Sequence, residues 1–171
     1  MTRLIRIMLT MAFGLSILLS AASARGQTKK NDADSTAIEQ VVSGFMANFN
    51  NHDAHAISAW FTEDSDYTNG GGINTHGRKA IEEHYLTLFA GPLANAQRTG
   101  VTVKSIRFLS PEIASVDISY VLEGMKASDG SISPSRAGLY TWTLVKQNDH
   151  WLIAVLHEIG IGQGPSPPQH R

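Results

Sequence analysis

The stretch AGLYTWTLVKQNDHWLIAVLHEIG, residues 137–160, holds two runs rich in β-branched and aromatic residues on either side of a short polar connection. Such runs predict strands, and the QNDH between them predicts a tight hairpin. Towards the N-terminus, VTVKSIRFL (101–109) and IASVDISYVLEG (113–124) have the same character. We therefore expect four long antiparallel strands in the second half of the chain.

The first half of the chain has the spacing of helices instead. Apolar residues recur at intervals of three and four between residues 38 and 49, and Thr36 and Glu39 can form a capping box at the start of that helix. Asp53 is placed to cap a short second helix, HAISAWF (55–61). A third helix is expected from about Arg78 to Phe89. Helices followed by strands, without internal repeats, predict an α+β domain.

Residues 1–24 have the features of a secretory signal peptide. Arg3 and Arg6 precede an apolar run from Ile7 to Leu19, and the small residues Ala22-Ser23-Ala24 form an A-x-A cleavage site. The run is shorter than the roughly 20 residues that a membrane-spanning helix needs. We therefore expect export to the periplasm or the medium, with no membrane span after cleavage.

The remaining chain reads as one domain between two polar segments, a flexible leader (25–34) and a tail (162–171), which leaves residues 35–161 for the fold. The sequence contains no cysteine, so neither disulfides nor thiolate chemistry is available. Its formal net charge is −1, with acidic and basic residues scattered along the chain. Nucleic acid is therefore not an expected partner.

The order of these elements resembles a known superfamily. Two helices, the segment FTEDSDYTNGGGINTHGRKAIEEHY (61–85), a third helix, and strands that end in W-x-I-x-x-x-H (151–157) are similar to the nuclear transport factor 2-like superfamily. Within it, the chain resembles the SnoaL-like and SgcJ/EcaC-type branch of small calcium/calmodulin-kinase-association-like domains. The resemblance covers about residues 35–160. It implies a cone, in which a curved antiparallel sheet wraps around three N-terminal helices and leaves a pocket between them.

Members of this superfamily include polyketide cyclases, dehydratases, steroid isomerases and association modules, so the fold alone does not decide the function. The steroid isomerases use an aspartate after the second helix as a base and a tyrosine on the first helix as a hydrogen-bond donor. Asn69 and Phe45 occupy the matching positions here. Neither side chain can perform those roles, so the resemblance does not predict that mechanism.

His157 is the expected proton-transfer residue. Alternation along the last strand places His157 on one face and Glu158 on the other, and we expect His157 to face the pocket and Glu158 to face outward. An imidazole there would titrate near neutral pH as an acid or base, with Asn69 orienting a carbonyl group. His157 is also explained as a core histidine. A bulge near Gly160 would exchange the two faces.

Aromatic residues are the expected ligand-binding set, although aromatic stripes on strands are also typical of a packed core. The candidates are Tyr67, Tyr140, Trp142, Trp60 and Tyr85. Arg136 is explained either as a partner for an anionic ligand at the pocket mouth or as a solvated surface residue. His52 and His55 lack a third ligand nearby in the sequence, so no metal and no cofactor are expected.

The predicted function is that of an exported domain that binds a small apolar or carbonyl-bearing molecule. If it is an enzyme, the residues suit a cofactor-free isomerase, cyclase or dehydratase that acts by proton transfer. The alternative is a non-catalytic association or ligand-carrying module. Both faces of residues 151–160 are apolar, so a second copy is expected to cover the outer face of the sheet as a homodimer.

Overall fold

The computed structural model describes residues 31–161. By its internal contacts the chain divides into a unit of residues 1–36 and a larger unit of residues 37–171. The predicted signal peptide, leader residues 25–30 and the tail lie outside the described residues. Among residues 31–161, no helix is long and apolar enough to cross a membrane.

In the first unit, residues 31–36 are described and are helical. The predicted helix start at Thr36 is therefore wrong. The Thr36 hydroxyl donates to the carbonyl oxygen of Asp32, 3.1 Å away, which is the bond a threonine makes inside a helix. This internal bond takes the place of the predicted capping box.

The larger unit begins with helical residues 37–50, which bury one apolar face. The buried residues are Ile38, Val41, Val42, Phe45, Met46 and Phe49. Helix α2, Ala54–Ser58, is capped as predicted, since the Asp53 carboxylate accepts from the Ala56 N–H at 2.9 Å. It ends before Trp60, which the sequence had placed in this helix. Helix α3, Arg78–Ala90, matches its prediction.

Six strands form one sheet in the order β2-β1-β6-β5-β4-β3. The strands are β1 (Phe61–Thr68), β2 (Asn74–His76), β3 (Gln97–Ser110), β4 (Ile113–Glu123), β5 (Arg136–Gln147) and β6 (His150–Ile161). The four long predicted strands are confirmed as β3 to β6, with antiparallel pairing between neighbours. The β5–β6 turn holds Asn148 and Asp149 with positive φ, as a two-residue hairpin requires.

Strands β1 and β2 fall in a segment rich in Gly, Asn and Asp, residues that are typical of turns. Ser65 and Tyr67 are nevertheless buried, and β1 lies parallel to β6. Pairing with β6 outweighs the low strand propensity of this segment. The sheet is therefore two strands wider than predicted, and its added edge carries Tyr67 into the interior.

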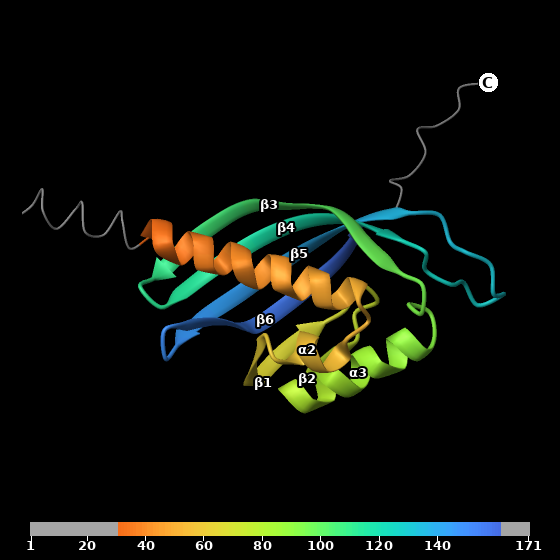
Figure 1. The fold of residues 1–171 in the computed structure, drawn as a ribbon, viewed down its shortest axis with the longest axis horizontal. Coiled ribbons are helices and arrows are strands. Elements are labelled where there is room, and N and C mark those ends of the chain that lie inside the picture. Colours follow the sequence, from red (N-terminus) through yellow and green to blue (C-terminus); the bar gives the residue numbers. More distant parts are fainter. Residues whose placement is uncertain (1–30, 162–171) are drawn as a thin grey trace, which may run out of the picture. The chain divides into compact units, whose positions relative to one another are not determined.

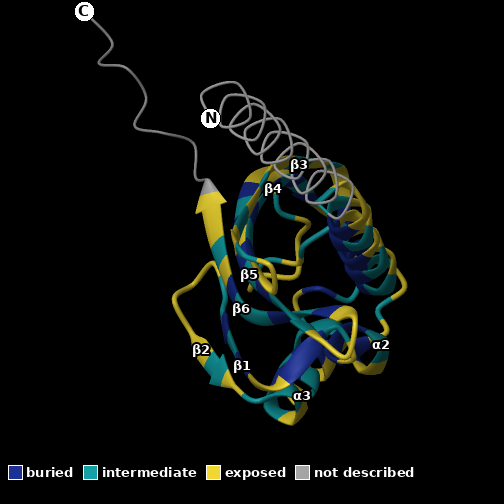
Figure 2. Cartoon of the chain, turned by 90° about the vertical axis from the view of Figure 1, so that its left-hand side faces the viewer, coloured by how far each residue is buried: buried dark blue, intermediate teal, exposed yellow. Residues whose placement is uncertain are grey.

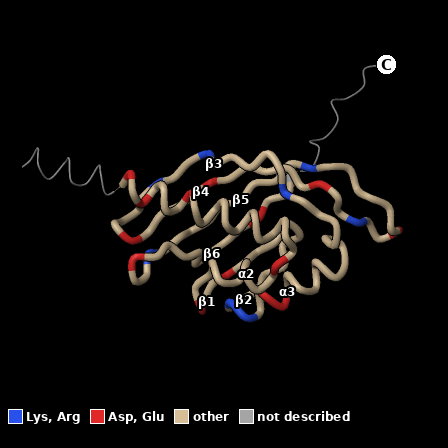
Figure 3. The backbone as a smooth tube through the Cα atoms, in the orientation of Figure 1, with Lys and Arg blue, Asp and Glu red and all other residues tan. Residues whose placement is uncertain are grey.

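The sheet curves around the helix of residues 37–50, and its edges do not meet (Figures 1 and 2). The concave face and the helices enclose a core centred on Phe45, whose ring lies 5.0 Å from that of Trp142 and 6.1 Å from that of Tyr140. This arrangement confirms the α+β cone. Lys and Arg are scattered among Asp and Glu and do not gather on one face of the described chain (Figure 3).

Candidate functional site

A β-bulge in β6 decides which side chains at the end of that strand reach the interior. Thr143 pairs with Val155 and Leu144 pairs with Ile153, which leaves Ala154 as the extra residue. Ile153 is buried before the bulge, and Leu156 is buried after it. A bulge of one residue shifts the alternation of faces by one position.

This shift turns Glu158 towards the interior and leaves His157 exposed. The Glu158 side chain is only 9% exposed. The predicted orientation, with His157 facing in and Glu158 facing out, is therefore wrong. The exchange foreseen for a bulge near Gly160 does occur, but its cause lies earlier in the strand, at Ala154.

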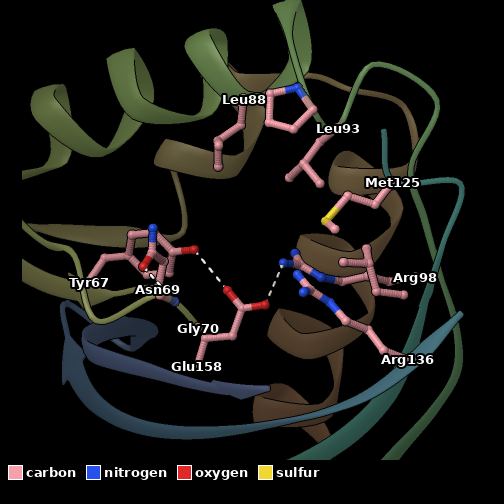
Figure 4. Close-up of a pocket in the computed structure, with 12 residues that line it drawn as sticks. Tyr67, Asn69, Gly70, Leu88, Leu93, Arg98, Met125, Arg136 and Glu158 are labelled. Carbon is pink, nitrogen blue, oxygen red and sulfur yellow. Dashed lines mark hydrogen bonds and ion pairs between the residues drawn. The ribbon is translucent and has the colours of Figure 1, made fainter. Parts of the chain in front are cut away.

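Both oxygens of the Glu158 carboxylate accept hydrogen bonds from buried side chains. The Tyr67 hydroxyl donates to Oε2 at 3.0 Å, and the Tyr120 hydroxyl donates to Oε1. Arg98 Nη2 lies 3.4 Å from Oε1 and completes an ion pair. Figure 4 shows Tyr67 and Arg98 approaching the carboxylate from opposite sides of the pocket. Strands β1, β3, β4 and β6 thus each contribute one group to a buried polar cluster.

The surroundings hold Glu158 in its charged form. Burial alone would raise the pKa of its carboxyl, but the Arg98 guanidinium and the hydrogen bonds from Tyr120 and Tyr67 outweigh burial and keep the pKa below its ordinary value. Burial raises the pKa of both tyrosine hydroxyls, so they remain protonated donors at neutral pH. The site therefore contains an anionic carboxylate and neutral phenols.

Arg98 is fixed in place from several directions. Its side chain is 2% exposed, and its guanidinium carbon lies 3.6 Å from the centre of the Phe49 ring. At the end of the first helix, the Asn50 side chain accepts from the Arg98 N–H at 2.7 Å and donates to the Arg98 carbonyl at 3.0 Å. Stacking on an aromatic face and these backbone bonds position the guanidinium beside Glu158.

Several polar atoms of this cluster lack a well-formed hydrogen bond among residues 31–161. They are the Tyr85 and Tyr140 hydroxyls and the Nε and Nη1 atoms of Arg98. The Tyr85 hydroxyl does lie close to Tyr67 and Arg98, and that of Tyr140 lies close to Tyr120. Most buried polar groups in proteins have a partner, so these four atoms carry a desolvation cost, as do Thr62 Oγ1, Ser65 Oγ and Trp142 Nε1 elsewhere in the core.

A cavity of about 120 Å³ opens onto the cluster. One wall is apolar and is lined by Leu88, Pro92, Leu93, Leu122 and Met125. The polar wall is lined by Tyr67, Arg98, Arg136 and Glu158, and the β1–β2 loop contributes Asn69, Gly70 and Gly71. The cavity therefore combines an apolar surface with a charged end, as binding sites for small organic molecules do.

The predicted pocket residues separate into three groups. Tyr67 and Asn69 line the cavity, but Asn69 Oδ1 is engaged by the backbone N–H groups of Gly71 and Ile73, at 2.9 and 3.0 Å. Tyr85, Tyr140 and Trp142 are fully buried behind the cavity and are not among its lining residues. Trp60 lines a separate hollow of about 260 Å³, together with Val41 and Trp151.

Among residues 31–161, no three His, Asp or Glu side chains lie close enough to form a metal site. His52 Nε2 lies 3.0 Å from the Ala96 carbonyl oxygen, and His55 Nδ1 lies 3.2 Å from the Glu82 carboxylate. The two histidines thus have different neighbours.

Nothing in the sequence pointed to Arg98, and Tyr120 remained an aromatic residue of either the core or the pocket. The expected strand began at Val101, which left Arg98 in a loop, whereas β3 begins at Gln97. Tyr120 carried a readable signal, because Val116, Ile118 and Tyr120 alternate with polar residues along β4. That alternation places Tyr120 on the inner face, where it is 3% exposed.

Residues 33–157 match the sequence profile of the SnoaL-like domain. The chain belongs to the SnoaL-like domain family. Among curated proteins, none matches the sequence significantly.

Solved structures show the SnoaL-like fold at low sequence identity. A type 2 hexachlorocyclohexane dehydrochlorinase is 14% identical, with a TM-score of 0.70 over 82% of this chain and 98% of that one. A ketosteroid isomerase-like protein from Erwinia carotovora atroseptica is 21% identical, with a TM-score of 0.63 over 75% and 96%. An NTF-2-like protein of unknown function from Shewanella oneidensis is 20% identical, with a TM-score of 0.62 over 74% and 98%. These similarities confirm the nuclear transport factor 2-like fold.

Proposed function

We propose that this SnoaL-like domain binds a small organic molecule in the Glu158 cavity and transfers a proton within it without a cofactor. The observation that carries the proposal is a buried carboxylate, held in its charged form, that lines a partly apolar cavity. A charged carboxylate is a base, and a buried base of this kind is a candidate for catalysis. Glu158 takes the role that the sequence had suggested for His157.

The hydrogen-bond donors around Glu158 limit what it can deprotonate. They lower its pKa and therefore weaken it as a base, so the substrate C–H must be acidified by a neighbouring carbonyl or a similar group. The single hydroxyl proton of Tyr67 is donated to Glu158 in the resting site, and it becomes available to a substrate carbonyl oxygen when Glu158 has taken up the substrate proton. Removal of a proton, followed by its return at another carbon or by loss of a leaving group, describes an isomerase or a dehydratase.

The names of similar proteins agree with this reaction class. One solved structure of the same fold is a dehydrochlorinase, and another is called ketosteroid isomerase-like. Asn69 and Phe45 stand where the steroid isomerases have their aspartate base and tyrosine donor. The proposed reaction therefore uses the same fold with a different base, Glu158.

The test combines native mass spectrometry with deuterium exchange. The purified protein is exposed to a cell-envelope metabolite extract in D₂O, beside Glu158→Gln. We expect the wild type to retain a small molecule and to exchange one of its carbon-bound protons, and the folded variant to exchange none. If both proteins retain a molecule and neither exchanges a proton, the cavity binds a ligand and proton transfer is refuted. If neither protein retains a molecule, both ligand binding and proton transfer are refuted.

Export is part of the proposal and is supported by the charge, apolar run and cleavage site of residues 1–24. N-terminal sequencing of protein recovered from outside the cytoplasm tests it, and the expected first residue is Arg25. An intact Met1 in that fraction would contradict cleavage.

A homodimer through the outer face of the sheet is a second proposal. Ile159 is 53% exposed on this face and pairs across the strands with Leu139, while Asp117 accepts from Ser105 and Thr141 there at 2.9 and 2.8 Å. An exposed apolar side chain beside hydrogen-bonded polar side chains is typical of a protein–protein interface. Analytical ultracentrifugation of the wild type and Ile159→Lys tests it, because a monomer in the wild type at high concentration would refute the dimer.

A further inference from the structure

We infer that the ligand of the Glu158 cavity is an organic anion whose charged group is bound by Arg136. This inference rests on the proposed function, because it specifies the ligand class of the same cavity. Three charged residues line the cavity: Arg98 and Arg136 are positive, and Glu158 is negative. The other lining residues carry no charge, so the cavity has one positive charge in excess.

The excess charge belongs to Arg136. Arg98 is buried and paired with Glu158, and its guanidinium stacks on Phe49. Both Glu158 oxygens already accept from Tyr67, Tyr120 and Arg98. The buried pair is therefore neutral as a unit, and it leaves the charge of Arg136 in excess.

Arg136 begins β5 and pairs with Leu122 in the sheet. Its guanidinium points into the cavity beside that of Arg98, as Figure 4 shows. Its charge is near enough to contribute to the lowered pKa of Glu158, yet among residues 31–161 its guanidinium forms no hydrogen bond or ion pair of ordinary length. Arg136 is an exposed residue that lines the cavity, so its N–H donors are available to a ligand at the mouth.

A guanidinium group recognises carboxylate and phosphate in particular, because its planar fork donates two parallel hydrogen bonds to either anion. The opposite wall is apolar, with Leu88, Leu93 and Met125 among its residues. The cavity of about 120 Å³ limits the apolar part to a short chain or a single ring. The ligand is therefore a small carboxylate or phosphate ester with an apolar body, oriented with its anionic group at the mouth.

Three probes of equal ring size test the inference by isothermal titration calorimetry on the full chain: benzoate, phenyl phosphate and neutral benzamide. We expect one of the two anions to bind the wild type about tenfold more tightly than benzamide, because a charge-assisted contact is added. Arg136→Gln should weaken binding of that anion by about fivefold to tenfold and leave benzamide unchanged. Arg136→Lys should restore part of the loss.

Arg107→Gln is the matched control, since Arg107 is an exposed arginine on β3 and does not line the cavity. It should bind the anion as the wild type does. Equal affinity for benzamide and both anions, or an unchanged anion affinity in Arg136→Gln, would overturn the inference while ligand binding in the cavity stands. Failure of all three probes to bind would overturn the inference and count against the cavity as a binding site.

Discussion

Replacing Arg98 with methionine removes the positive partner of a buried carboxylate and keeps most of the aliphatic stem. In the native protein the two side chains are 2% and 9% exposed, and Arg98 Nη2 lies 3.4 Å from Glu158 Oε1. The variant leaves Glu158 buried with only the Tyr67 and Tyr120 hydroxyls as partners. Burial of an unpaired charge is among the largest single costs that a substitution can impose.

The expected loss in the free energy of unfolding is about 3–5 kcal/mol at neutral pH, the range for removing one member of a buried ion pair. For a domain of this size, each kcal/mol shifts Tm by about 4 °C, so Tm should fall by roughly 12–20 °C. The double variant Arg98→Met/Glu158→Gln removes both charges. It should be more stable than Arg98→Met alone, by about 2 kcal/mol, because no unpaired charge remains.

The pH dependence of stability should also change sign. In the wild type the pKa of Glu158 is lowered, so its stabilising contribution is present above the ordinary glutamate pKa and is lost as pH falls through the lowered value. Without Arg98, burial is the dominant influence and raises that pKa. The variant should then be most stable in acid and lose stability as pH rises through the raised pKa.

Urea unfolding followed by tryptophan fluorescence, at several pH values between about 2 and 8, measures both effects. A loss of less than about 1 kcal/mol in the free energy of unfolding of Arg98→Met would refute the buried ion pair, since exposed ion pairs contribute that much. A double variant as unstable as the sum of the two single variants would refute it as well, because the two charges would then be uncoupled.

Three further predictions concern single positions. Gly138→Ala should lower the free energy of unfolding by about 1–3 kcal/mol, because the added Cβ collides with the Tyr120 ring. Its cross-strand neighbour Gly160 faces open space, so Gly160→Ala should change that free energy by less than about 0.5 kcal/mol. Thermal unfolding compares the two variants, and equal losses would contradict the collision. His157→Ala should change stability by less than about 0.5 kcal/mol and leave ligand retention intact, because the side chain is exposed; loss of ligand in a folded variant would refute this. Asn69→Ala should remove hydrogen-exchange protection from the Gly71 and Ile73 amides, because both donate to the Asn69 side-chain oxygen. Asn69→Asp keeps an acceptor there and should keep the protection. Identical exchange in the two variants would show that this oxygen does not order the β1–β2 loop.

The long elements of the fold were predictable because each carries many residues with one period. The helix of residues 37–50 and strands β4 and β5 bury a face that repeats several times, and β3 packs a partly buried apolar face on the same core, so one atypical residue does not hide the pattern. Strands β1 and β2 are rich in polar residues, and they form because β1 pairs with the edge of β6 and β2 then pairs with β1. That dependence on a distant segment has no local sequence signal.

The candidate site was predicted less well for a related reason. One extra residue at Ala154 exchanges His157 and Glu158, and nothing in the run WLIAVLHEIG marks where a bulge falls. Tyr67, one of the aromatic candidates, does line the cavity. Arg98 lay outside every predicted element, and its role depends on meeting Glu158 from another strand.

The polar cluster has an energetic cost. A buried ion pair often contributes less stability than apolar residues of similar volume, and the underused Tyr85 and Tyr140 hydroxyls add desolvation without full hydrogen bonds in return. These groups gather behind a cavity, next to Arg136, whose guanidinium forms no hydrogen bond or ion pair with another described residue. An anion that enters the cavity would form an ion pair with Arg136 and would exclude water from the cluster. Each electrostatic contact in the cluster becomes stronger when water is excluded. Local destabilisation that a ligand would offset is characteristic of a binding site, and this is the physical reason to assign function to this end of the cone.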